Sequence, residues 1–268
     1  CGGHPQLGRN LSLHPALNVA GRFSEPVFAW RGVLQSVGID RFHDGEGILL
    51  EATAMPPGLG SLGLPGWGPE LRRELVSCSH LAMLGAMVAD APSGRVYGRH
   101  RALITYRLTR ADGARLLRAA ELAGRVLLAA GAMELLTGMP HAPRVRTETD
   151  LCDAVARADP RRLHLAAFHP TGTARAGGDP FSHPVDPEGR LRGVAGVWLC
   201  DASILPSCPR VNPQVSIMAV ALGVASRAAG ESEGTAGPTD TITSAIASRG
   251  PRRRLQRADD RRPILEST

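Results

Sequence analysis

Glycine and proline interrupt this chain at short intervals, which favours short secondary-structure elements joined by turns. The 268 residues include 31 glycines and 21 prolines. Three segments of strand-like composition follow one another in the first half, at residues 16–23, 27–38 and 47–55. Consecutive short strands separated by such turns are typical of an antiparallel sheet. We therefore expect the first half of the chain to form a mainly antiparallel sheet.

Amphipathic helices are expected beside this sheet. Residues 114–130 carry apolar side chains at helical spacing, with Asp112 as the expected N-cap and Gly131 as the expected C-terminal cap. A shorter helix is expected after Thr149, as far as residue 158. The remaining expected elements are a helix over 69–81 and strands over 83–88 and 96–109. The mixture indicates an α+β fold in which helices back an antiparallel sheet.

A second kind of strand is expected later in the chain. Residues 196–201 read G-V-W-L-C-D, an apolar run that ends in the acid Asp201. A run that is apolar on both faces is typical of a buried, parallel strand. Asp201 would then lie just beyond the carboxyl end of the strand, where open α/β sheets bind ligands.

The pair Asn212–Pro213 is a favourable helix start, and a helix is expected over residues 214–228. The apolar side chains that recur there at helical spacing are Val215, Met218, Ala219, Leu222 and Ala225. The first turn of a helix has unpaired N–H groups and the positive end of the helix dipole. This helix start therefore suits an anion, either a phosphate or the negative charge of a reduced flavin.

Three motifs in a fixed order resemble a known family. His169 is followed by Pro-Thr-Gly-Thr, the run over 196–201 continues into Ala-Ser, and Asn212–Pro213 opens the last helix. Residues 7–15, L-G-R-N-L-S-L-H-P, are similar to a further element of the same family. Together these motifs resemble the C-terminal part of the glucose–methanol–choline (GMC) oxidoreductases, which are FAD-dependent alcohol oxidases and dehydrogenases. Asparagine rather than histidine at position 212 resembles the cholesterol-oxidase and long-chain-alcohol-oxidase branches.

The resemblance implies roles for individual residues. His169 would take the hydroxyl proton of an alcohol, since imidazole titrates near neutral pH, and Asn212 would donate its side-chain amide to the substrate oxygen. Contacts to FAD are implied for Asp201, Ala202, Pro213 and Gln214. From the residues alone, a histidine before proline is more often structural, and an asparagine before proline often only caps a helix. His14, in the earlier element, is interpreted as structural.

The resemblance also implies how the chain is divided. Residues 1–160 would form a substrate-binding region, and residues 161–230 would add a strand and a helix to a Rossmann-like FAD-binding domain. No counterpart of the family's N-terminal FAD-binding half is found in the sequence, so we expect a fragment or one part of a split enzyme. Residues 231–268 are poor in apolar side chains and are expected to be disordered.

The expected activity is the oxidation of an alcohol to a carbonyl, with hydride transfer to FAD. The low aromatic content of 4% favours an aliphatic or sterol alcohol over a sugar, although only weakly. The alternative is a non-catalytic accessory chain that keeps the substrate fold and cannot bind FAD alone. A separate N-terminal FAD-binding half is the expected partner in either case.

Composition argues against several other classes of protein. The net charge of +6 is spread along the chain without a basic stripe interleaved with aromatic residues, so nucleic-acid binding is not indicated. The five cysteines form no C-x-x-C pair, and neither a metal site nor a disulfide framework is expected. No signal peptide or transmembrane run is recognisable, and a cytoplasmic location is expected.

Residues 58–63 read G-L-G-S-L-G and match the dinucleotide-binding pattern G-x-G-x-x-G. Pro56–Pro57 precede the match directly, where that motif needs a strand, and Pro65 interrupts the helix that should follow. We therefore interpret this segment as a flexible lid over a site rather than as a cofactor loop.

Overall fold

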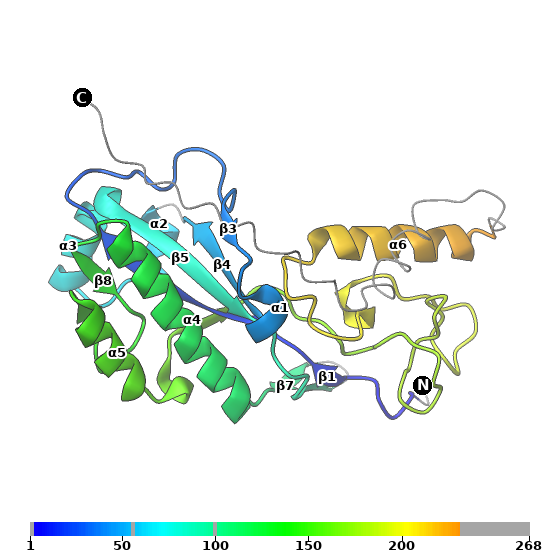
Figure 1. Ribbon diagram of the computed structural model, residues 1–268. Helices are drawn as coiled ribbons and strands as arrows, with labels where there is room; N and C mark the ends of the chain where they lie inside the picture. Colours follow the sequence, from blue (N-terminus) through cyan, green and yellow to red (C-terminus); the bar gives the residue numbers. More distant parts are fainter. Residues whose placement is uncertain (1–2, 55–56, 99–100, 231–268) are drawn as a thin grey trace, which may run out of the picture.

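The computed structural model describes residues 3–54, 57–98 and 101–230 (Figure 1), so the tail over 231–268 that we expected to be disordered lies outside the described residues. Its largest element is a seven-stranded sheet with the order β3-β4-β5-β2-β8-β9, in which β10 also pairs with β2. The pairings within this sheet are antiparallel. The strands are β2 (Pro15–Arg22), β3 (Gly38–Ile39), β4 (Ile48–Thr53), β5 (Leu81–Val88), β8 (Glu134–Leu136), β9 (Arg144–Val145) and β10 (Leu165–Ala167).

One face of this sheet is covered by helices. The long helix α4 (Arg110–Ala129) packs against β2 and β5, and α5 (Glu148–Ala156) packs against α4 (Figure 1). Because side chains alternate along a strand, Leu17 and Val19 of β2 point into this interface, where they are buried. Each such side chain contributes roughly 1.5–3 kcal/mol through burial. The predicted α+β fold with an antiparallel sheet is confirmed.

The caps of the two helices differ from those expected. Thr109 is the N-cap of α4, and its Oγ1 accepts a hydrogen bond from the N–H of Asp112, at 3.1 Å. The helix therefore begins earlier than predicted, because Thr109 supplies the cap one turn before Asp112. Thr147 caps α5 in the same way, in place of Thr149. Gly131 follows α4 with a left-handed φ of 95°, which confirms it as the C-terminal cap.

The strand predicted over 27–38 is wrong except at its end, where β3 begins. Phe28, Gly32 and Gln35 have φ values of 49°, 95° and 57°, and a strand requires negative φ. This segment is instead a loop beside the sheet. The helix predicted over 69–81 is shorter than expected: α3 (Pro69–Val76) is followed by the 3₁₀ turn η2 (Cys78–His80), and β5 then begins at Leu81.

The remaining strands form a separate small sheet. β1 (Arg9–Leu11) pairs with β6 (Gly94–Tyr97), which pairs with β7 (Leu103–Thr105). The last two strands confirm the prediction of strand structure within residues 96–109, and residues 99 and 100 between them lie outside the described residues. Other short elements are α1 (His43–Glu46), α2 (Pro57–Gly60), and the 3₁₀ turns η1 (Ser61–Gly63), η3 (Pro160–Arg162) and η4 (Ala202–Ile204). The G-x-G-x-x-G match thus forms two short turns, α2 and η1, rather than the start of a long helix.

The strand predicted over 196–201 does not form. Trp198 makes only an isolated bridge to Arg190, and Val197 is 36% exposed. A buried parallel strand needs neighbouring strands on both sides, and the described residues supply none here. The Rossmann-like strand that we expected is therefore missing from the described structure, whereas the helix after it, α6 (Gln214–Ala228), is confirmed.

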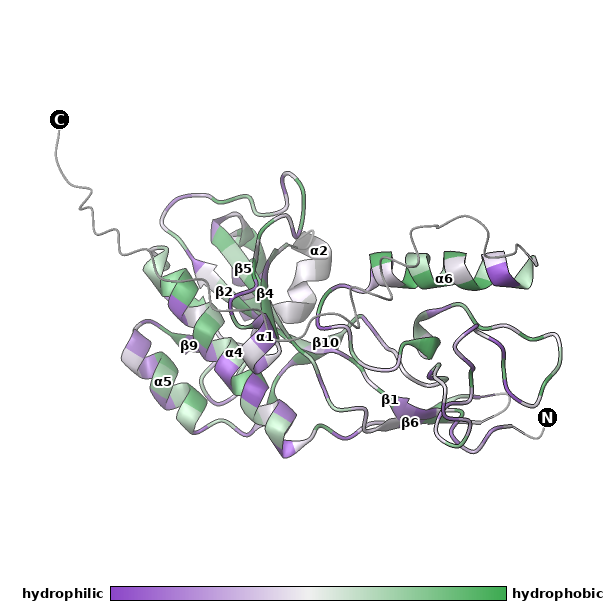
Figure 2. Ribbon diagram, turned by 45° about the vertical axis from the view of Figure 1, so that its right-hand side comes forward, coloured by the Kyte–Doolittle hydropathy of each residue, from purple (hydrophilic) through white to green (hydrophobic). Residues whose placement is uncertain are grey.

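Helix α6 lies away from the large sheet, beside the loops of residues 168–212 (Figure 1). Its buried residues are Gly223 and Val224, and Val224 packs in a small core with Val185 and Ile204. The large side chains of the predicted apolar stripe are exposed to solvent instead. Figure 2 shows the apolar residues as bands along α6. The exposed fractions are 78% for Val215, 63% for Met218 and 65% for Leu222.

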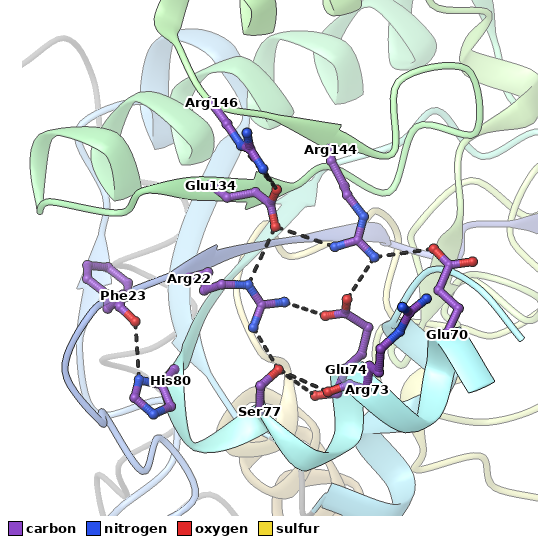
Figure 3. Close-up of polar contacts among 10 residues, drawn as sticks. All are labelled: Arg22, Phe23, Glu70, Arg73, Glu74, Ser77, His80, Glu134, Arg144 and Arg146. Carbon is purple, nitrogen blue, oxygen red and sulfur yellow. Dashed lines mark hydrogen bonds and ion pairs between the residues drawn. The ribbon is translucent and has the colours of Figure 1, made fainter. Parts of the chain in front are cut away.

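A polar cluster joins α3 to one end of the large sheet (Figure 3). The carboxylate of Glu74, which is 6% exposed, accepts hydrogen bonds from Arg22 of β2 and, at 2.7 Å, from Arg144 of β9. Glu134 of β8 also binds both guanidinium groups, at 3.4 Å each. These charge-assisted bonds fix α3, and with it the η2 turn, against the sheet.

None of the described helices is long and apolar enough to cross a membrane. Within the described ranges, no three His, Cys, Asp or Glu side chains lie close enough together to hold a metal ion.

Candidate active site

The sheet brings two histidines from distant parts of the chain together. β10 pairs with β2 so that Ala167 lies opposite Pro15, and His169 and His14 lie just outside these paired residues. Nδ1 of His14 is 3.1 Å from Nδ1 of His169, which is hydrogen-bonding distance. His14 is almost fully buried, whereas His169 is partly exposed.

Both histidines are neutral near pH 7 because burial disfavours the imidazolium form. Burial, with a smaller contribution from neighbouring His169, lowers the pKa of His14 to about 4. Burial also lowers the pKa of His169 below the ordinary histidine value. Two neutral rings that face each other through Nδ1 share one proton. When His169 carries that proton and donates it to His14, Nε2 of His169 has a free lone pair and can act as a base.

A buried carboxylate fixes His14 in an unusual conformation. Asp90 accepts hydrogen bonds from the N–H of His14 at 3.0 Å, the hydroxyl of Ser12 at 2.7 Å and the hydroxyl of Tyr106 at 2.9 Å. His14 has a φ of 53°, in the left-handed region that is uncommon for residues other than glycine. Asp90 therefore holds the backbone that positions the ring against His169.

Asn212 pairs with an acid that the sequence analysis did not single out. Its Nδ2 donates to the carboxylate of Glu51 on β4, at 3.0 Å to Oε1 and 3.2 Å to Oε2. The N-cap residue of α6 is Pro213, and Asn212 does not cap the helix with its side chain. Its Oδ1 is buried and has no hydrogen-bond partner among the described residues. A hydroxyl group entering here would find an open acceptor.

The strand register places the His14–His169 pair and the Glu51–Asn212 pair on opposite sides of a row of apolar side chains that crosses three strands. Ala16 of β2 lies opposite Met87 of β5, which lies opposite Leu49 of β4, and these three side chains form a buried cluster. His14 precedes Ala16 by two residues, and Glu51 follows Leu49 by two residues. Each two-residue step is roughly 7 Å along a strand. The row thus forms a floor with the histidine pair beyond one edge and the Glu51–Asn212 pair beyond the other.

The four residues expected to contact a cofactor are divided between two segments. Asp201 caps η4, with its Oδ1 accepting from the N–H of Ser203 at 2.7 Å, and Ala202 is the first residue of that turn. Pro213 is buried, and Gln214 is exposed at the start of α6. The first N–H groups of such a helix have no partner within it, so they can receive an anionic group.

Comparison with known proteins agrees with the motifs. A model of the family described as "GMC oxidoreductase" matches residues 91–221. Two GMC-type oxidoreductases of Mycobacterium tuberculosis strains are each 56% identical over 225 residues. The chain belongs to the GMC oxidoreductase family. It corresponds to a C-terminal part of the family's members.

Further relatives of this GMC chain have more specific names. A long-chain-alcohol oxidase of Arabidopsis thaliana is 30% identical over 246 residues, covering 84% of this chain and 32% of that protein. The M. tuberculosis matches cover 84% of this chain and 36% of those proteins. The chain therefore spans about a third of the length of these relatives.

Solved structures show the same fold. Pyridoxine 4-oxidase from Mesorbium loti aligns with a TM-score of 0.54 and 21% identity, covering 86% of this chain and 45% of that one. Formate oxidase from Aspergillus oryzae aligns with a TM-score of 0.58 and 16% identity, covering 85% and 48%.

Proposed function

We propose that this chain supplies the proton-handling side of the active site in an FAD-dependent alcohol oxidoreductase. The observation that carries the proposal is the Nδ1–Nδ1 contact of His14 and His169, which places a neutral imidazole at the edge of the sheet. The histidine pair offers a neutral base for the hydroxyl proton, and in this proposal Asn212 holds the alcohol oxygen. The name of the long-chain-alcohol oxidase relative supports an alcohol as the substrate class.

The chemistry divides between the protein and the cofactor. FAD, when bound, supplies the acceptor for the hydride that leaves the alcohol carbon. His169 accepts the hydroxyl proton on Nε2, so that one hydride and one proton leave the alcohol and a carbonyl remains. Asn212 holds the alcohol oxygen through its amide, which is itself oriented by the charged acceptor Glu51. His14 holds the ring of His169 in place through the Nδ1–Nδ1 contact.

The start of α6 fits the anionic edge of a flavin. The helix has 15 residues, enough for a developed dipole, and Gln214 and Val215 at its first turn are exposed. In this proposal Pro213 and Gln214 present the helix start to the isoalloxazine ring. Asp201 and Ala202, at the exposed start of η4, approach the ribityl or phosphate region.

The rest of the flavin site would come from a separate polypeptide or from the part of the relatives that this chain does not span. The exposed stripe of Val215, Met218 and Leu222 on α6 supports this, since a row of large apolar side chains is normally covered in an assembled protein. A partner that carries the N-terminal FAD-binding half would cover it. Without that partner, the chain would keep the substrate fold and fail to hold FAD, which is the alternative function.

The test is flavin binding by the purified chain, measured as absorbance in the flavin bands. The chain would be mixed with FAD alone, and with FAD plus the portion of the M. tuberculosis relative that it does not match. We expect bound flavin and alcohol-dependent bleaching in the second mixture. Bound flavin that is never reduced by an alcohol would support the accessory function, and protein that stays colourless in both mixtures would contradict the proposal.

A further inference from the structure

The sheet face that carries the candidate active site has a polar row across its middle. Asn18 of β2 lies opposite Gly85 of β5, which in turn lies opposite Glu51 of β4. We propose that Asn18 and Thr53 bind a second hydroxyl group of the substrate above Gly85, so that the preferred substrate is a diol. This inference rests on the proposed alcohol oxidation and adds a specificity site to it.

The polar row lies on the open face of the sheet. The neighbouring row of Ala16, Met87 and Leu49 is two residues away on each strand, so the two rows point to the same side. The opposite face is covered by α4. Asn18 and Glu51 are nevertheless partly exposed, so a ligand can reach them from the side of the candidate active site.

Gly85 leaves the place between its neighbours without a side chain. A Cβ atom at Gly85 would lie 3.3 Å from Oδ1 of Asn18 and 3.5 Å from Oγ1 of Thr53. Both oxygens are therefore close enough to contact a single hydroxyl group placed just above Gly85. A glycine inside a strand often marks the close approach of a ligand or of another backbone, which agrees with this position.

The hydroxyl group of Thr53 lacks a partner. Its Oγ1 is buried and forms no hydrogen bond with the described residues. Leaving a buried hydroxyl unpaired is unfavourable, and a hydrogen-bonding ligand removes that cost. A substrate hydroxyl between Thr53 and Asn18 would therefore stabilise the complex through both side chains.

The chemistry of the two side chains suits a hydroxyl group rather than a charged group. The amide of Asn18 and the hydroxyl of Thr53 can each donate and accept a hydrogen bond, as a substrate hydroxyl can. The carboxylate of Glu51 already accepts from the amide of Asn212 with both oxygens. An ammonium group above Gly85 would therefore lose its water without gaining a free carboxylate as partner.

Glu51 connects this position to the proposed reaction centre. It holds Asn212, which in the proposed function binds the reacting hydroxyl, and it shares a row with Asn18. Residues two strands apart in a row are roughly 10 Å apart at the backbone, and their side chains shorten that distance. A short flexible diol can therefore contact Asn212 at one end and Asn18 at the other.

Binding is tested by NMR of side-chain amides in the purified chain, without flavin. The sequence contains three asparagines, Asn10, Asn18 and Asn212, so labelling of asparagine with ¹⁵N gives few signals. The probes are 1,5-pentanediol and 1-pentanol, which differ only in the second hydroxyl. The diol should shift the signals of Asn18 and Asn212, 1-pentanol should shift only that of Asn212, and Asn10 is the internal control. One additional hydrogen bond should make the diol bind about two- to tenfold more tightly.

Two variants test the location of the second hydroxyl. Gly85→Ala places a methyl group at the proposed position and should abolish the advantage of the diol. Thr53→Val keeps the shape of the side chain without its hydroxyl and should reduce that advantage. Thr105→Val, at an exposed threonine of β7, is the matched control and should preserve it. Circular dichroism would verify that the variants fold.

Equal affinity for the two alcohols, a diol that leaves the Asn18 signal in place, or an advantage that persists in folded Gly85→Ala protein would overturn the inference. Because no flavin is present, diol binding at Asn18 in a protein whose assembly oxidises no alcohol would contradict only the proposed function. Alcohol oxidation by the assembly, with no diol binding at Asn18, would contradict only the diol site.

Discussion

Nδ1 of buried His14 lies 3.1 Å from Nδ1 of His169, although 154 residues separate them in the sequence. The contact exists because β10 pairs with β2, and because Asp90 holds His14 in a left-handed conformation. Under the proposed function, His14, which the sequence analysis interpreted as structural, has a second role, which is to position the ring of the proposed base.

Replacing His14 should therefore slow catalysis without removing the base. Asparagine tolerates the left-handed φ of this position but is too short to reach His169, so His14→Asn is the suitable variant. Loss of one hydrogen bond should lower kcat about tenfold and leave KM nearly unchanged. Steady-state kinetics of the flavin-containing assembly would measure this, with His164→Asn as the control at an exposed histidine. An unchanged kcat would remove the positioning role.

The same variant should change how stability depends on pH. The pKa of His14 is about 4 in the folded chain, mainly because of burial, and near 6.5 when unfolded. Between these values the unfolded chain binds a proton that the folded chain does not, so stability should fall as pH decreases from 6.5 to 4. The expected loss is roughly 3 kcal/mol. Urea unfolding of wild type and His14→Asn at pH 7 and pH 4.5 should show a smaller pH effect in the variant, and equal effects would contradict this assignment.

The hydrogen bond between Glu51 and Asn212 predicts that replacing Glu51, an acid outside the family motifs, lowers kcat/KM. Glu51→Gln keeps the shape of the side chain but removes the charge that orients the Asn212 amide. A charge-assisted hydrogen bond contributes about 1.5–3 kcal/mol, so kcat/KM should fall about 10- to 100-fold. Glu148→Gln, at an exposed glutamate on α5, is the control. If both variants react at the wild-type rate, Glu51 has no part in orienting the substrate.

The polar cluster of Figure 3 predicts a large stability effect at Glu74. Glu74→Ala leaves Arg22 and Arg144 without their buried acceptor, which should cost about 3 kcal/mol or more. Glu46→Ala breaks a more exposed ion pair, with Arg118, and should cost less than about 1 kcal/mol. Chemical denaturation would compare them. Equal losses would show that the cluster does not anchor α3.

Helices and strands could be predicted from the sequence where the residues of the segment itself determine the structure. The apolar spacing of α4 and the turn residue Gly131 gave that helix nearly its full length, and the strands β2, β4 and β5 lie within or close to the expected ranges. The strand prediction for residues 27–38 was wrong because the composition of this segment favours a strand, whereas Phe28 and Gln35 adopt positive φ values that tertiary contacts impose. The prediction of a parallel strand over residues 196–201 was wrong because such a strand depends on neighbouring strands, which its own residues cannot reveal.

The site was only partly predictable for the same reason. His169 and Asn212 stand in recognisable motifs. His14 meets His169 only because β10 pairs with β2, and Glu51 meets Asn212 only because the loop before α6 reaches β4. A single acid in a strand ordinarily indicates a solvated position, and nothing near Glu51 in the sequence points to Asn212. The alternation of β4 did place Glu51 on the face opposite Leu50, which was the one available signal.

The most direct test of the central claim is turnover by His169→Ala in the flavin-containing assembly, compared with His164→Ala. Removing a general base typically costs about 10²–10⁴-fold in rate. The account predicts a fall of that size in alcohol oxidation with the flavin absorbance retained, and an unaffected rate for His164→Ala. Retention of flavin with wild-type turnover in His169→Ala would contradict the assignment of His169 as the base.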